Sequence, residues 1–211
     1  MSKIATIRFF LSSSILIAFL FPNYSVAKCP TRMGSVYPQD FFLVIAHRGS
    51  TIKFPENTIP AFKESLNTDG ANSLAVDLSL TKDRKIVLWH DWDLTSPIAM
   101  VRKEKGEEVS KFKPYGPPLV ELRAQKKVSE FNFSEFIDKH GYKDKITNVK
   151  TNFKIPTFQD LIEWAAKQNK LKLLILKLRA PIDEKYLIPV MFEEIRRTVR
   201  KLSLPPRFQF V

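Results

Sequence analysis

The sequence predicts an α/β protein built around a mostly parallel sheet. Short apolar segments of strand length alternate along the chain with longer segments of helical periodicity. Strands that alternate with helices indicate parallel pairing through helical crossovers. Charged or polar residues stand at or near the ends of several predicted strands, and these ends are where parallel sheets hold their ligands.

Five segments have the length and composition of strands. In "SLAVDLSL", the alternation of apolar and polar residues places Asp77 on one face with Ala75 and Ser79. "KIVLWHD" is predicted to be the third strand and ends at His90. The five predicted strands are 41–46, 73–80, 85–91, 171–178 and 207–211.

Three segments have the pattern of amphipathic helices. In the first, Asn57 or Thr58 is suited to cap the helix. In the second, Thr157 and Asp160 have the spacing of a capping box. The three predicted helices lie within 57–71, 155–170 and 184–202.

The segment 92–155 interrupts this alternation. It is rich in lysine, and we interpret it as a solvated, irregular insertion after the third strand, with a helix near 129–142. His140 has no motif around it and is predicted to lie at the surface. Trp89 and Trp92 flank "HD" and are predicted to belong to the core or to a pocket wall.

The N-terminus has the features of a secretory signal peptide, residues 1–27. A basic start precedes a short apolar stretch, and "SVA" ends at Ala27, where we expect cleavage. A retained membrane anchor is the alternative. An extension, 28–40, and a domain, 41–211, would form the mature chain, periplasmic or secreted and without a stable membrane span. Cys29 is the only cysteine, so no disulfide can form within the chain, and Lys28 before it disfavours a lipoprotein.

The composition favours anionic partners. The formal net charge is +12, which suits phospholipid head groups or other polyanions. No nucleic-acid-binding module is recognisable, so we expect no nucleic acid as partner.

The residues near the predicted strand ends suggest a chemistry. His47 and His90 suit a reaction in which one ring takes a proton and the other donates one. Arg48 and Lys177 suit phosphate oxygens. Asp77 faces the same side and suits a metal, so together these residues suggest phosphodiester cleavage.

The motifs "AHRG", "PENT", "GANSLAVDLSLTKD", "WHD" and "IPTFQDLIEWA" resemble, in order and spacing, those of the glycerophosphodiester phosphodiesterase family. The resemblance implies a TIM-barrel fold and the hydrolysis of glycerophosphodiesters to an alcohol and glycerol 3-phosphate with a divalent cation, Ca²⁺ or Mg²⁺. It implies that His47 and His90 form the acid–base pair, and that Arg48 binds phosphate. It also implies that Glu56 is the supporting glutamate of the first loop and that Asp77 is a metal ligand.

The chain departs from the family pattern in two ways. Ala75 and Ile175 stand where the family carries carboxylates, so two of three expected metal ligands are missing. The length suffices only for the first five strands of a barrel, and the open sheet edge would favour self-association. We therefore expect feeble or no hydrolysis of glycerophosphocholine, even with Ca²⁺ or Mg²⁺. The alternative function is a catalytically degenerate relative that binds anionic lipid head groups or a partner protein.

Overall fold

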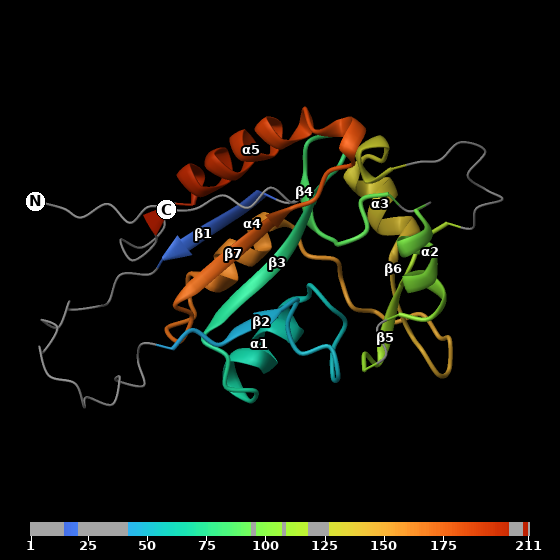
Figure 1. Ribbon diagram of the computed structural model, residues 1–211, viewed down its shortest axis with the longest axis horizontal. Coiled ribbons are helices and arrows are strands. Elements are labelled where there is room, and N and C mark those ends of the chain that lie inside the picture. The colour runs from blue at the N-terminus through green and yellow to red at the C-terminus, as the bar shows by residue number, and fades with distance from the viewer. Residues whose placement is uncertain are drawn as a thin grey trace, which may run out of the picture.

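The computed structural model describes residues 15–20, 42–93, 96–106, 109–117, 127–202 and 209–210. Its main sheet is mixed, with parallel pairing at the centre (Figure 1): β2 pairs with β3, and β3 with β7, in parallel, whereas β1 pairs antiparallel with β7 and β8. This partly formed parallel sheet agrees with the predicted partial barrel. The strand order is β2 (Ile45–His47), β3 (Ser73–Leu80), β7 (Leu173–Leu178), β1 (Ile15–Leu20) and β8 (Gln209–Phe210).

Three helices pack against this sheet, and all three were predicted. Thr58 caps the first helix and accepts from the amide of Ala61. Thr157 and Asp160 form the expected capping box of the second. Their apolar faces bury one core against alternate residues of β3 and β7, among them Leu74, Leu78 and Leu176. The helices are α1 (Ile59–Asn67), α4 (Phe158–Ala165) and α5 (Leu187–Lys201).

The predicted third strand was expected to join the parallel sheet, but it pairs antiparallel. β4 (Ile86–Leu88) pairs antiparallel with β3 and lies off the path of the main sheet. The physical reason is the length of the connection. Only residues 81–85 separate the two strands, and a parallel crossover needs a dozen or more. The amide of Thr81 donates to the carbonyl of Lys85 and closes a hairpin instead.

The insertion is folded, which corrects the expectation of an irregular segment. Its helices and strands form a lobe to one side of the main sheet (Figure 1). A second apolar cluster contains Val87 and Trp89 together with Phe131, Phe136 and Tyr142. The lysine-rich insertion therefore has a buried apolar core of its own. Its elements are α2 (Pro97–Glu104), β5 (Phe112–Tyr115), the 3-10 turn η2 (Val128–Glu130), α3 (Phe133–Lys139) and β6 (Gly141–Asp144).

His140 belongs to this second core, and its predicted surface position is wrong. The ring is buried and stacks on Phe136 with 4.3 Å between ring centroids. Burial lowers the pKa of His140 to about 4. Trp89 is buried nearby, as predicted.

The expected signal peptide overlaps one described element. β1 comes from the apolar stretch 15–20 and pairs along the whole length of β7. The predicted cleavage site near Ala27 and Cys29 lie outside the described residues, so export remains a prediction. None of the described helices has the length and hydropathy needed to cross a membrane. A 3-10 turn, η3 (Ile182–Glu184), links β7 to α5.

Candidate active site

Three parallel strands, β2, β3 and β7, bring the predicted site residues His47, Asp77 and Lys177 together. In the register of the sheet, His47 lies opposite Ala75, and Asp77 lies opposite Lys177. The Nε2 atom of His47 is 3.9 Å from the Oδ2 atom of Asp77. It is also 3.1 Å from the Nζ atom of Lys177. We call this group, with Arg48 and Arg179, the Asp77 site.

Arg48 lies in the turn that follows β2, and its backbone and side chain contact residues of β3 and of the loop that contains Glu56. Its φ of 61° is in the left-handed region, and its amide donates to the carbonyl of Ala75 at 2.8 Å. The side chain is buried. Its Nε lies 2.8 Å from Oδ2 of Asp77, and its Nη1 donates to Glu56 at 2.9 Å. Gly49 follows with φ 85°, and a Cβ there would come within 2.7 Å of Ala61, so glycine is required.

Asp77 is the centre of the site and is fully buried. Arg179 grips its Oδ1 with two nitrogens, Nε at 2.9 Å and Nη2 at 2.8 Å. Asn57 donates to Oδ2 at 3.3 Å and accepts from the Asp77 amide at 3.1 Å. Burial alone would raise the pKa of Asp77, but the guanidinium groups of Arg48 and Arg179 outweigh it and hold the pKa below its ordinary value.

A second layer of charges surrounds this centre. Arg102 of α2 reaches Glu56 and also lies 3.3 Å from Asp91. The Nδ1 atom of His90 is 2.6 Å from the carboxylate of Asp91. The amide of Trp89 donates to the carbonyl of Asp77 at 3.1 Å, so His90 follows a residue bonded to the site.

The electrostatics of His47 differ from those of an ordinary surface histidine. Burial, with the charge of Arg48 second, lowers the pKa of His47 to about 4. Burial also lowers the pKa of Lys177. An ammonium can only donate, so the neutral His47 ring accepts at Nε2 and carries its own proton on Nδ1.

The comparisons with known proteins identify the family of the chain. A model of the glycerophosphoryl diester phosphodiesterase family matches residues 47–201. The chain belongs to this family. An uncharacterized Bacillus subtilis protein is 31% identical over 134 residues, which cover 64% of this chain and 44% of that protein. A glycerophosphodiester phosphodiesterase of Caldanaerobacter subterraneus is 51% identical over 49 residues, 23% of this chain and 20% of that enzyme.

The fold of the family is recognisable as well. A crystal structure from Silicibacter pomeroyi, assigned as a glycerophosphoryl diester phosphodiesterase, superposes with a TM-score of 0.57 at 20% identity. The match covers 78% of this chain and 55% of that one, which supports a partial TIM-barrel fold. The chain thus spans about half, or less, of the length of these relatives.

The donor set of the Asp77 site does not fit the divalent cation that the family implies. Both oxygens of Asp77 have guanidinium or amide nitrogens as partners. The neighbouring positions on the same face of the sheet are Ala75 and Ile175, which offer no side-chain oxygen. In the described part of the chain, no group of three or more His, Cys, Asp or Glu side chains is arranged to hold a metal ion. A hard cation needs several oxygen ligands.

Two arginines that contact the predicted site residues were not predicted from the sequence. Arg179 stands two residues after Lys177 and therefore on the same face of the extended chain, a signal that the sequence does contain. Arg102 lies in the insertion, 46 residues from its partner Glu56, and no local pattern indicates that contact.

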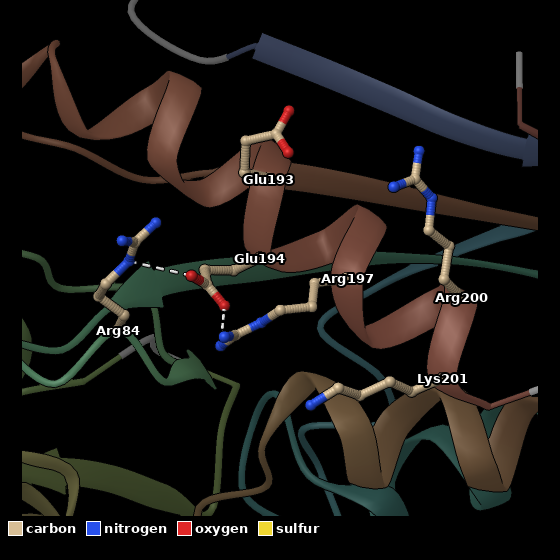
Figure 2. A pocket seen from close by; sticks show the side chains of 6 residues that line it. All are labelled: Arg84, Glu193, Glu194, Arg197, Arg200 and Lys201. Atoms are coloured by element: carbon tan, nitrogen blue, oxygen red, sulfur yellow. Dashed lines mark ion pairs between the residues drawn. The ribbon is translucent and has the colours of Figure 1, made fainter.

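A second carboxylate, Glu194 of α5, pairs with two arginines, one of which, Arg84, lies in the turn between β3 and β4 (Figure 2). Glu194 points between Arg84 and Arg197 and forms an ion pair with each, with 2.9 Å to the Nε atom of Arg84. These residues line a hollow of about 540 Å³ together with Glu193, Arg200 and Lys201. We call this group the Glu194 site.

Proposed function

We propose that the chain is a phosphoric diester hydrolase that cleaves glycerophosphodiesters to an alcohol and glycerol 3-phosphate. The charge balance of the site supports this substrate class. Four cationic side chains face three carboxylates, which leaves one net positive charge for an anion; they are Arg48, Arg102, Lys177 and Arg179 against Glu56, Asp77 and Asp91. Family membership supports the reaction type.

His47 is the proposed general base. With a pKa of about 4 its ring is neutral at pH 7 and has a lone pair on Nε2. That lone pair faces Lys177 at 3.1 Å. When a phosphate arrives, the ammonium turns to its oxygens, and Nε2 is released to take the proton of the attacking hydroxyl or water.

His90 is the proposed general acid. Its Nδ1 is held by Asp91, which orients the ring and leaves Nε2 for the substrate. As the new P–O bond forms, the bond to the leaving alcohol breaks and His90 gives that oxygen a proton. At the end of the step, His47 has gained the proton of the nucleophile and His90 has lost one proton to the oxygen of the leaving alcohol.

We propose that Arg48 attracts the phosphate by its positive charge and also holds the Asp77 carboxylate in position. Its Nε and Nη1 face Asp77 and Glu56, so the side chain is oriented by carboxylates. Lys177 is partly exposed and is the more open phosphate donor. Glu56 supports the site by holding Arg48 and Arg102.

The cellular setting is also a proposal. We infer Sec-type export with cleavage near Ala27, and a lipid-derived substrate outside the cytoplasm, because of the basic start and the short apolar stretch. Mass spectrometry of the secreted protein should show a chain that begins near Lys28. An intact Met1, or a lipid on Cys29, would contradict it.

The test of the reaction is the release of glycerol 3-phosphate from glycerophosphocholine, with the full chain and with His47→Gln and His90→Gln. We expect slow turnover that each substitution abolishes, while Arg200→Ala on the exposed side of α5 leaves it unchanged. Binding of anionic head groups without any turnover would instead support the degenerate relative, which the absence of carboxylates at Ala75 and Ile175 favours.

A further inference from the structure

We propose that Arg179 takes the place of a divalent cation beside Asp77, so that the Asp77 site binds phosphate through guanidinium and ammonium groups of the chain alone. The inference rests on the proposed function for its ligand class, a phosphate ester. It adds that the chain itself supplies the positive charge that family members commonly obtain from a metal ion.

The sheet places the replacement where a cation would stand. Side chains two residues apart share a face of a strand, so Ile175, Lys177 and Arg179 lie in one row on and just beyond β7. The facing row on β3 contains Ala75 and Asp77. This face thus carries apolar side chains at the two positions where the resemblance implies carboxylates, and Arg179 stands beside the carboxylate of Asp77.

The guanidinium of Arg179 is held rigidly in that place. Its Nε and Nη2 form a fork on Oδ1 of Asp77, at 2.9 and 2.8 Å. Its Cζ lies 5.6 Å from the centre of the Trp92 ring, a cation–π arrangement. Its backbone amide donates to the carbonyl of Leu78 at 2.8 Å and extends the pairing of β7 with β3. A fixed guanidinium needs no reorganisation to receive an anion.

A metal ion would meet strong opposition in the same place. It would have to displace Arg179 or Arg48 from Asp77, which is in contact with both, and Lys177 is close by across the sheet. The incoming double positive charge would then stand among three cations with one carboxylate as ligand. Such a ligand set is far below what Ca²⁺ or Mg²⁺ requires.

The first experiment measures binding of glycerol 3-phosphate to the full chain by calorimetry, once with EDTA and once with millimolar Ca²⁺. We expect the same Kd in both. In EDTA, Arg179→Ala should weaken binding by roughly 10- to 100-fold, the effect of losing a charged partner. Arg197→Ala is the matched control, since it also removes an arginine from a carboxylate, and it should leave the Kd unchanged.

The second experiment compares Ca²⁺ binding by two variants, Ala75→Glu/Ile175→Glu and the same pair with Arg179→Ala. We expect the triple variant to bind Ca²⁺ roughly tenfold more tightly than the double variant. The reason is that the triple variant lacks the Arg179 guanidinium, which otherwise occupies the position of the cation beside Asp77. Equal affinity in the two variants would overturn the proposal.

The wild-type chain alone also decides the matter if the variants fail to fold. Tighter binding of glycerol 3-phosphate in Ca²⁺ than in EDTA, or no binding in either, would overturn the proposal. Binding that is equal in both, without turnover of the diester, would support it and would contradict the hydrolase function only.

Discussion

The Asp77 site and the Glu194 site share one feature and differ in their surroundings. Each contains one buried carboxylate paired with two arginines (Figure 2 shows the second). At Asp77 the arginine side chains are only 8% and 13% exposed. At Glu194 they are 56% and 60% exposed. The first lies beside two histidines, near the ends of β2 and β4, and the second joins the surface of α5 to the turn between β3 and β4.

The difference shows that burial, rather than ion pairing as such, distinguishes a site from a surface feature. Exposed arginines are screened by water and salt, and such pairs contribute little to stability. Buried arginines depend on their carboxylate, because an unpaired buried charge is costly. Only the Asp77 site therefore holds its charges in fixed positions, which is the property that recognition of a phosphate requires.

The largest expected effect is that of Asp77→Asn on stability. The substitution removes the negative charge that two nearly buried guanidinium groups share, although Arg48 keeps its pair with Glu56, so we expect a loss of about 3–5 kcal/mol in the free energy of unfolding. Urea denaturation followed by circular dichroism measures it. A loss below about 1 kcal/mol would mean that the Asp77 site behaves like a surface pair.

An intermediate effect is expected from the protonation of His47, which makes the free energy of unfolding depend on pH. The folded-state pKa of His47, about 4, lies below its ordinary value of 6.5. The ring therefore contributes stability above pH 6.5, and this contribution is lost as the pH falls towards 4. His47 is about half-exposed, so after solvent screening we expect only about 1 kcal/mol.

NMR titration separates His47 from His140, whose pKa is also about 4 through burial. Lys177→Met should raise the pKa of His47, because it removes a neighbouring positive charge, and should leave His140 unchanged. An unchanged His47 titration would show that the charge of Lys177 does not contribute to the pKa of His47.

The smallest effect is expected at the Glu194 site. Arg197→Ala should cost less than about 1 kcal/mol, and molar salt should remove most of that. Thermal unfolding at low and high salt measures both values. A larger loss that persists in salt would remove the contrast with the Asp77 site.

The local structure could be predicted from the sequence, and the long-range contacts could not. The caps at Thr58 and Thr157 depend on neighbouring residues and were found. The hairpin before β4 could have been found too, because its connection is too short for a crossover. The contact of Arg179 with Asp77 joins residues 102 positions apart, and only the register of β3 and β7 reveals it.

The insertion shows a further limit of pattern reading. Its apolar residues come from short segments separated by lysines, so no single segment has a clear period. His140 was placed at the surface for the same reason, since its stacking partner Phe136 lies on a helix too short to show a stripe.

The central claim is that the chain itself supplies the positive charge of its active site. The most direct measurement is the rate of glycerophosphocholine hydrolysis by the intact chain in EDTA and in Ca²⁺. We predict a slow rate, about 10²- to 10³-fold below that of an enzyme with a complete stabilising clamp, and the same value in both solutions. Fast hydrolysis that requires Ca²⁺ and disappears in EDTA would contradict the account, and would show that carboxylates such as Glu56 and Asp91 hold a metal after all.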